Sequence, residues 1–506
     1  MDLIPRFILA GTHSGCGKTT VSAGVMAALV KRGLQVQPYK VGPDYIDPMF
    51  HTYITGRASR NLDSWLLDAE TLAYLFHRAA RGMDLAVVEG VMGLYDGCSV
   101  SSMEGSTAHV ARLLNCPVIL VIQARGMSLS AAALVNGYMD FMGGSDIRGV
   151  ILNGISSPGL FLHLKKIIEE NTGVRVVGYL PESEDYTLAE RHLGLVPDSG
   201  VPDLKEKVAK LAARVEECID LDLLLRMAKD AGQFRAPTSE RFQALKAQGS
   251  RIAPATAHTA PAAAQTAPAA APTQTGAASA QTGAASARIG AASARIAVAK
   301  DEAFNFYYQD NLDLLQMLGA ELLEFSPLRD RALPEEATGV YLGGGYPEVF
   351  ARELSENTPM LADLKGKLNR GLPAYGECGG FMYLCRSIRD HGGNTFSMAG
   401  LFPYSCVMTE KLQRFGYVHL NFMKSCILGQ PGSSVRGHEF HYSTVDAAPE
   451  EGRMEVVKYR QTGDGPRWRD GYRQVETWAG YPHIHFWSNP ETARNFVKNC
   501  TKETCI

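Results

Sequence analysis

The stretch GTHSGCGKTT, residues 11–20, decides the fold of the N-terminal half of the chain. It follows the apolar run FILAGT and leads into a helix-forming segment, TTVSAGVMAALVKRG. In this order of strand, glycine loop and helix, the backbone N–H groups of the loop face bound phosphates. The sequence therefore predicts a nucleotide site formed by Gly11, Thr12, Ser14, Gly15, Cys16, Gly17, Lys18, Thr19 and Thr20.

Two side chains of this loop point to ATP with Mg²⁺ as the ligand. Lys18 is expected to reach the β- and γ-phosphates, and the Thr19 hydroxyl is expected to bind the metal. The spacing is unusual, because Gly11 lies one residue early and Thr12 stands where the first glycine is expected. A chance Gly-Lys-Thr turn is the alternative, and the position between a strand and a helix argues against it.

Outward from this loop, apolar runs alternate with helical segments through the first half of the chain. The runs are FILAGT, QVQPYK, DLAVVEG, PVILVIQ, IRGVILN and VRVVGYL. Apolar strands that alternate with helices imply a parallel sheet covered on both faces. The pattern restarts after residue 294 with RIAVAK, LDLLQMLG, AELLEFS, GVYLGGG and GLPAYGE. We therefore predict an α/β protein with two doubly wound domains, the first of which is P-loop NTPase-like.

The composition changes between the two patterns. Residues 253–294 are almost entirely Ala, Pro, Thr, Gln, Gly and Ser, and include the near-repeat TGAASAQTGAASARIGAASAR. Its period of seven invites a coiled-coil interpretation, but glycine interrupts every copy. A disordered, flexible linker with an end-to-end distance of about 35 Å is favoured. The predicted division is an ATP-binding domain at 1–240, the linker at 241–294 and a second domain at 295–506.

Length and charge exclude several classes of function. The chain has 506 residues, more than one ordinary domain needs, and its formal net charge of -3 gives no basic field for nucleic acid. Ten cysteines without metal-type pairs fit a reducing cytoplasm. We find no signal peptide and no apolar run near the roughly 20 residues that span a bilayer. We expect a cytoplasmic protein that binds small molecules and neither nucleic acid nor membrane, and we leave a homodimer open.

Four acidic residues are expected at the carboxyl ends of parallel strands, where ligands bind in open α/β sheets. Asp44 and Asp47 follow QVQPYK, Glu89 ends DLAVVEG, and Asp96 follows shortly after. Asp44 and Glu89, with Thr19, offer the oxygen ligands that Mg²⁺ prefers, although each acid alone could be a turn residue. For each basic candidate, a solvated surface charge is the alternative. The candidates for contact with an anionic substrate are Lys40, Asp47, Arg57, Arg60, Asp96 and Arg191.

The second domain contains AYGECGGFMYL, which predicts a nucleophile on a strand-to-helix turn. Cys378 lies at this turn, where the helix N-terminus favours its thiolate. Gly344 and Gly345 of YLGGGYPE can present backbone N–H groups to a developing oxyanion. His483 and His485 lie two apart in HIHF and are expected on one face of a strand, one to activate the cysteine and one to orient the first. A small buried cysteine is the alternative.

Together these stretches resemble the cobyrinic acid a,c-diamide synthase family. The resemblance rests on GTHSGCGKTT, YKVGPDYIDPMFH, GRASRNLDSWLL, VVEGVMGLYDG, ERHLGLVP, DEAFNFYYQDNL, YLGGGYPE, GECGGFMYL, GHEFHYS and HIHF, which cover most of both domains. It implies a first domain like dethiobiotin synthetase and a second like a class I glutamine amidotransferase. It also implies ATP- and Mg²⁺-dependent amidation of the a and c acetate side chains of a corrinoid, a step of cobalamin biosynthesis.

The resemblance assigns roles to single residues, and the sequence departs from the family pattern at some positions. Carried over by motif, Cys378 is the nucleophile and His483 its base, while His485 stands where other class I glutaminases carry a carboxylate. Gln123 replaces the aspartate that the family usually shows, so a metal or nucleotide contact there is left open. Close relatives amidate nickel-sirohydrochlorin or other sirohydrochlorin-type tetrapyrroles, and the sequence does not exclude those substrates.

The residues support amidation independently of the family. A carboxylate must be activated before ammonia displaces an oxygen, and phosphorylation by ATP creates the leaving group. The competing class is a partitioning-type P-loop ATPase that acts as a switch. Those proteins place an additional lysine early in the loop, where this chain has Thr12 and His13, and they have no use for Cys378.

Overall fold

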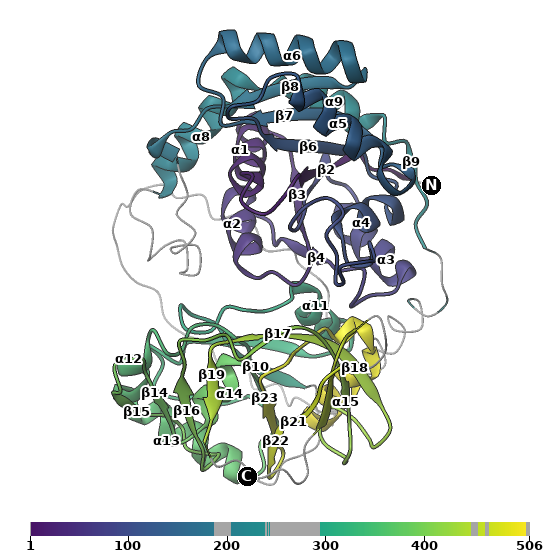
Figure 1. The fold of residues 1–506 in the computed structure, drawn as a ribbon. Helices are drawn as coiled ribbons and strands as arrows, with labels where there is room; N and C mark the ends of the chain where they lie inside the picture. Colours follow the sequence, from purple (N-terminus) through teal and green to yellow (C-terminus); the bar gives the residue numbers. More distant parts are fainter. Residues whose placement is uncertain are drawn as a thin grey trace, which may run out of the picture.

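The computed structural model describes residues 2–186, 204–237, 240, 242, 294–446, 454–460 and 465–501. Figure 1 shows the N-terminal domain, coloured purple to blue, stacked on the C-terminal domain, coloured green to yellow. Both are α/β domains, so the predicted fold class is confirmed. Most of the predicted linker and the predicted substrate residue Arg191 lie outside the described residues.

A seven-stranded parallel sheet forms the centre of the N-terminal domain. Every residue of the inner strands β2, β3 and β5 is buried, as expected for a sheet covered on both faces. In sheet order the strands are β4 (Arg60–Leu62), β3 (Val36–Val41), β5 (Leu85–Glu89), β2 (Arg6–Gly11), β6 (Val118–Gln123), β7 (Ile147–Asn153) and β8 (Arg175–Leu180). A separate antiparallel pair joins β1 (Asp2–Leu3) to β9 (Gln233–Phe234).

Helices cover both faces of this sheet (Figure 1). One face packs against α1 (Lys18–Lys31), α8 (Leu204–Cys218) and α9 (Leu221–Lys229). The other packs against α3 (Ala69–Ala80), α4 (Thr107–Leu113), α5 (Ser130–Asp140) and α6 (Pro158–Thr172). The remaining pieces are α2 (Ile46–Thr55), η1 (Phe141–Gly143) and η2 (Glu184–Tyr186). Local signals fix the ends: the Ser157 side chain caps the start of α6, and Gly173 ends it with a φ of 72°.

The described part of the C-terminal domain contains three sheets. Its central sheet is parallel except for its last strand, and runs β11 (Glu321–Phe325), β10 (Arg295–Ala299), β12 (Gly339–Leu342), β13 (Ala374–Glu377), β23 (Thr477–Gly480) and β22 (Tyr472–Gln474). An antiparallel sheet runs β21 (Arg467–Asp470), β20 (Met454–Lys458), β17 (Arg414–Asn421), β18 (Ser434–His441) and β24 (His483–Ile484). A small mixed sheet runs β15 (Thr395–Ser397), β14 (Ser387–Arg389), β16 (Ser405–Met408) and β19 (Ser443–Val445).

Helices flank the central sheet of this domain (Figure 1). They are α11 (Gln309–Met317), α12 (Ala351–Glu356), α13 (Thr358–Asn369), α14 (Gly379–Leu384), α15 (Pro490–Cys500) and the short η4 (Phe486–Ser488). In the part of the chain that is described, no helix is both long enough and apolar enough to cross a membrane.

The two domains are in direct contact, and charged groups cross the interface. Arg60 of β4 donates to Asp310 at 2.8 Å and to Asp313 at 2.6 Å, both on α11. The hydroxyl of Tyr417 on β17 donates to Asp63 at 2.7 Å. Apolar residues of both domains also belong to one continuous buried core. The interface therefore holds the carboxyl edge of the first sheet against the second domain.

Candidate active site

The phosphate loop has the conformation that its sequence predicts. Strand β2 ends at Gly11, helix α1 begins at Lys18, and Gly15 and Gly17 between them have φ values of 82° and 93°. Only glycine adopts these values without strain. The Lys18 ammonium donates to the carbonyls of His13 at 3.1 Å and Met92 at 2.5 Å, and burial lowers its pKa. Its charge thus lies inside the loop that is expected to surround phosphates.

A buried cluster of charged residues lies beside the loop, at the carboxyl ends of β3 and β5. The Lys40 ammonium donates to Asp47 at 2.5 Å and to Glu89 at 2.7 Å, and lies 3.9 Å from Asp44. The other oxygen of Glu89 lies 2.8 Å from His51 Nε2. We had not singled out His51, although it ends the motif YKVGPDYIDPMFH. Because helix α2 carries it back toward the sheet, only the fold reveals this contact.

The charges of this cluster stabilise one another. Burial alone would raise the pKa of Glu89, but Lys40 and His51 hold it well below its usual range. Burial alone would lower the pKa of Lys40, but Glu89 and Asp47 raise it well above its usual range. For Asp47, burial and the nearby charge of Glu89 raise the pKa. Lys40 is therefore an ammonium paired mainly with an ionised Glu89.

The oxygen donors at this edge fit a magnesium ion that arrives with a nucleotide. The Thr19 hydroxyl donates to Glu89 at 2.9 Å, so the two groups predicted as metal ligands lie together, with Asp44 nearby and partly exposed. No group of three His, Cys, Asp or Glu residues in the described ranges is arranged as a complete metal site. Mg²⁺ in nucleotide sites commonly takes one or two carboxylates and completes its shell with phosphate oxygens and water.

Three other predicted substrate residues lie in structural roles. Asp96 accepts from Gly93 N at 2.9 Å and stabilises its own turn. Arg57 donates to Gln35, which lies at the amino end of β3, a strand length of about 20 Å from the acidic cluster. Arg60 is engaged by the two aspartates of α11. These positions correct our expectation that Arg57 and Arg60 would line the substrate site.

The predicted nucleophile lies at a strained turn between β13 and α14. Cys378 has φ 47° and ψ −102°, which is unfavourable for any residue with a side chain, and its N–H donates to Gly480 O at 2.8 Å. Burial, followed by the nearby charge of Glu348, raises the pKa of the thiol well above its usual range. The expected thiolate is therefore not the resting form, and the cysteine needs a base when it reacts.

Two glycine segments and a histidine meet at this turn. A Cβ atom added to Gly344 would lie 2.5 Å from Cε1 of His483, and one added to Gly379 would lie 3.1 Å from the nitrogen of Gly345. The φ of 152° at Gly345 also favours glycine. The backbone of YLGGGYPE thus lies close to both the histidine ring and the residue after the nucleophile, and its role toward an oxyanion stays a prediction.

The two histidines of HIHF do not contact each other as a pair. His483 lies in β24, and its Nδ1 is 3.6 Å from the carboxylate of Glu377. His485 lies beyond the end of that strand with its ring centroid 4.6 Å from that of Tyr308, and burial lowers its pKa to about 4. Neither ring nitrogen of His485 has a hydrogen-bond partner among the described residues. The expectation that His485 orients His483 is therefore corrected, because the His485 ring packs against Tyr308 and neither of its nitrogens bonds to His483.

Tyr45 connects the two clusters of functional residues. It directly follows Asp44, and its buried ring lies between side chains of the second domain. Its ring centroid is 5.0 Å from that of Phe306, 4.9 Å from that of Tyr308 and 5.1 Å from that of His483. The loop that carries the acids of the first domain therefore reaches His483 of the second.

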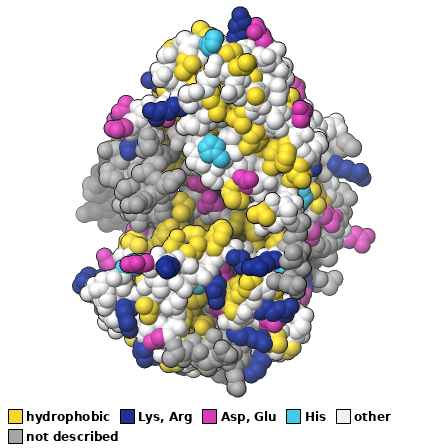
Figure 2. Space-filling view, viewed as in Figure 1, with side chains coloured by type: hydrophobic (Ala, Val, Ile, Leu, Met, Phe, Trp, Pro, Cys, Tyr) yellow, Lys and Arg dark blue, Asp and Glu magenta, His cyan; other side chains and the backbone are white. Residues whose placement is uncertain are grey.

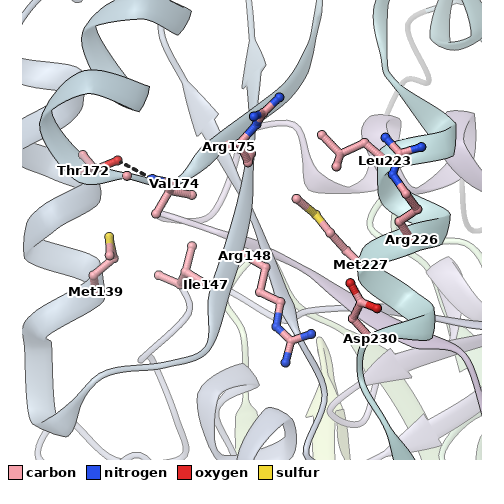
Figure 3. A pocket seen from close by; sticks show the side chains of 11 residues that line it. Met139, Ile147, Arg148, Thr172, Val174, Arg175, Leu223, Arg226, Met227 and Asp230 are labelled. Carbon is pink, nitrogen blue, oxygen red and sulfur yellow. Dashed lines mark hydrogen bonds between the residues drawn. The ribbon is translucent and has the colours of Figure 1, made fainter.

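A surface cavity of about 520 Å³ lies elsewhere. Figure 3 shows Arg148, Arg175 and Arg226 around it, with the hydrogen bond from Val174 N to Thr172 Oγ1 at 3.1 Å. It opens where β7 and β8 begin, whereas the phosphate loop and Glu89 lie where strands end. The cavity is therefore at the wrong edge of the sheet to belong to the active site.

The fold and these sites define a class of protein in which a P-loop nucleotide domain is joined to a cysteine glutaminase. Residues 7–196 match the family model described as the CobQ/CobB/MinD/ParA nucleotide binding domain. Residues 295–491 match the CobB/CobQ-like glutamine amidotransferase domain. The second match is to the kind of domain for which a switch-type ATPase has no use.

Similarity over nearly the whole chain identifies the family. The chain is 39% identical to the cobyrinate a,c-diamide synthase of Caldanaerobacter subterraneus subsp. tengcongensis, over 98% of each protein. It is 40% identical to the Listeria innocua enzyme of that name, over 96% of this chain and 97% of the other. It is also 40% identical to the Salmonella typhimurium enzyme, over 97% of each. The chain belongs to the cobyrinate a,c-diamide synthase family of glutamine-dependent amidotransferase ligases.

Proposed function

We propose that this chain converts the a and c acetate carboxylates of cobyrinic acid into carboxamides, using ATP and glutamine. The observation that carries the proposal is the position of Tyr45, between the Lys40 cluster of one domain and His483 of the other. Ammonia released at the second site would thus form beside the site where a carboxylate is activated. Relatives that carry the name cobyrinate a,c-diamide synthase support the substrate.

In the first half-reaction, an oxygen of the substrate carboxylate attacks the γ-phosphorus of ATP, and ADP leaves. Lys18 offsets charge on the transferred group, and Thr19 and Glu89 would hold Mg²⁺, which offsets charge on the phosphates. Ammonia then attacks the acyl phosphate, loses a proton and displaces inorganic phosphate. Lys40 is the buried cation closest to the acids, and it is our candidate for holding the substrate carboxylate.

In the second half-reaction, Cys378 attacks the carboxamide carbon of glutamine. His483 accepts the thiol proton and returns it to the leaving ammonia, and water then hydrolyses the thioester to glutamate. The N–H groups of Gly345 and Gly379 lie close to the turn and are candidates for stabilising the oxyanion. The raised pKa of the thiol is consistent with proton transfer that waits for glutamine.

A pair of exposed aromatic rings favours a planar substrate. Phe415 and Phe440 are 59% and 48% exposed and lie opposite each other on β17 and β18. Their side chains project on the same face as those of Tyr417 and His438, which contact the first domain. Figure 2 shows hydrophobic side chains gathered where the two domains meet. A tetrapyrrole ring could cover this face while its acetate groups reach toward Lys40.

Two experiments test the proposal. Mass spectrometry of products from cobyrinic acid, sirohydrochlorin and nickel-sirohydrochlorin should show two added amides on cobyrinic acid. Diamidation of a sirohydrochlorin alone would instead establish the alternative substrate class. With ¹⁸O in the substrate carboxylates, label should appear in inorganic phosphate, with ADP as product. Label in AMP, or unlabelled phosphate formed with the amide, would exclude the acyl phosphate.

A further inference from the structure

The carboxylate of Glu377, immediately before the nucleophile, is held in one position from three sides. Glu377 is the last residue of β13 and is 1% exposed. Its Oε1 accepts from Ile484 N at 3.0 Å and from the hydroxyl of Tyr375, and its Oε2 accepts from the hydroxyl of Tyr341 at 3.2 Å. Donors of this kind stabilise an ionised carboxylate inside a protein. None of these three donors is a cation, and among the described residues no arginine or lysine lies at hydrogen-bond distance from the carboxylate.

Among the described residues, the basic side chain within ion-pair distance of this carboxylate is the ring of His483. Its Nδ1 lies 3.6 Å from Glu377 Oε2, and this nitrogen has no hydrogen-bond partner among the described residues. The distance is slightly too long for a hydrogen bond, as catalytic contacts often are before substrate binds. The Cε1 edge of the ring, between its two nitrogens, faces the glycine backbone at Gly344.

We propose that Glu377 is the positioning residue of the glutaminase, accepting the Nδ1–H of His483. This assignment rests on the proposed function, in which His483 is the base. With the proton held on Nδ1, Nε2 has a free lone pair and can take the proton of Cys378. The carboxylate also stabilises the imidazolium that results. The acid thus precedes the nucleophile in the chain, and His485, which follows the base, does not fill this role.

A purely structural role for Glu377 makes different predictions. In that case the carboxylate only ties Tyr341, Tyr375 and β24 together, and its loss would loosen the fold around the site. Any loss of glutamine-driven amidation relative to ammonia-driven amidation would then follow from the lower stability of the second domain, and not from a changed proton equilibrium. A role toward His483 instead changes the proton equilibrium at Cys378, which can be measured in folded protein.

The test compares Glu377→Gln with Glu377→Asp in the full-length chain. The amide has the same shape but can donate to Nδ1, which favours the wrong tautomer; the matching change in a serine protease lowers kcat about 10⁴-fold. We expect E377Q to lose glutamine-driven amidation by 10²-fold or more, with ammonia-driven amidation within about twofold of wild type. E377D keeps the charge but draws it back from Nδ1, so it should recover at least tenfold of the loss while its glutaminase kcat stays below that of wild type. If E377Q does not fold, an E377D variant with unchanged glutaminase kcat would overturn the proposal.

Alkylation of Cys378 by iodoacetamide as a function of pH supplies the readout that a structural role would not move. In E377Q the pH at which the alkylation rate reaches half its maximum should be higher than in wild type. The thiolate of Cys378 forms together with the imidazolium of His483, and the variant lacks the carboxylate that stabilises this imidazolium. His485→Gln is the matched control and should keep the wild-type profile. An unchanged profile in E377Q, or an equal shift in H485Q, would overturn the proposal. Cys378→Ala tests the proposed function separately from the role of Glu377. If this variant retains glutaminase activity, Cys378 is not the nucleophile and the proposed function itself fails.

Discussion

Arg60 is predicted to hold the two domains together and to take no part in binding the substrate. Its guanidinium is 14% exposed and donates to Asp310 and Asp313 across the interface. Arg57 lies three residues away, is half-buried on the first domain and contacts Gln35 of that domain. The two arginines are therefore a matched pair, and alanine at each position separates interface loss from simple loss of charge.

The magnitude follows from burial. Removing one partner of a buried ion pair costs about 3–5 kcal/mol, because the remaining charge is left unpaired. Asp310 is 2% exposed, and the described residues give its side chain no other cation at hydrogen-bond distance, whereas Asp313 keeps Arg78. We therefore expect Arg60→Ala to cost about 3 kcal/mol of unfolding free energy, and Arg57→Ala to stay within about 0.5 kcal/mol of wild type.

Urea unfolding measures the loss of unfolding free energy in Arg60→Ala. Two activity assays then show whether the substitution affects the substrate site or the interface between the domains. Ammonia-driven amidation needs the first domain, so its KM for the tetrapyrrole should change less than twofold in Arg60→Ala. Glutamine-driven amidation also needs the two domains to be correctly placed, so that ammonia from the second site reaches the first. In Arg60→Ala some ammonia should escape, and more glutamine should be hydrolysed for each amide formed. Asp310→Asn in the same chain should restore part of the stability, because it removes the unpaired charge. A tenfold higher KM with unchanged stability would refute the reasoning and return Arg60 to the substrate site.

Four further predictions follow from the two sites. Lys18→Ala should abolish amidation with either nitrogen source, and residual ammonia-driven turnover would mean that the phosphate loop is misassigned. Gly344→Ala places a Cβ 2.5 Å from the His483 ring and should abolish glutamine-driven amidation while ammonia-driven turnover survives in a folded variant. Replacing residues 253–294 with a Gly/Ser chain of equal length should leave activity nearly unchanged, and a collapse with both domains folded would show that this segment has its own structure. Because the folded-state pKa of Glu89 lies below its unfolded value of about 4.3, its ion pairs stabilise the fold above that pH and are lost as the pH falls below it. Glu89→Gln should therefore be less stable at neutral pH and show a shallower loss of unfolding free energy in acid; an unchanged acid limb would contradict this.

Most strands of both central sheets could be predicted from the sequence because they are short, largely apolar runs, whereas β4, β22 and β23 were not predicted. FILAGT corresponds to β2, QVQPYK to β3 and DLAVVEG to β5, and in the second domain GVYLGGG contains β12 and GLPAYGE contains β13. Burial on both faces imposes this pattern locally, whatever the rest of the chain does. The antiparallel strands β17 to β21 were not predicted. Their side chains alternate between the core, the first domain and solvent, so no simple periodicity marks them.

The site was predictable where a motif combines a backbone conformation with a side chain, and not where side chains meet across the fold. Lys18 and Cys378 each follow a strand and precede a helix, so their positions depend on neighbouring residues in the chain. The contact of His51 with Glu89 spans 38 residues, and the contact of Glu377 with His483 depends on two different sheets. One feature of the sequence could have pointed to Glu377: it is a carboxylate at the end of a predicted buried strand, directly before the nucleophile.

The packing of Tyr45 gives a physical reason for two domains to work as one enzyme. The residue before it belongs to the acidic cluster, and helix α2 begins directly after it, so its backbone cannot move without moving that cluster. Its ring is packed among Phe306, Tyr308 and His483, and a close-packed interior transmits such a displacement instead of absorbing it. If Mg²⁺ and a substrate carboxylate bind as we propose, they compete for the partners of Lys40 and rearrange the ions around it. We therefore expect glutamine hydrolysis to depend on occupancy of the first site, with the loop at residues 42–47 as the connection.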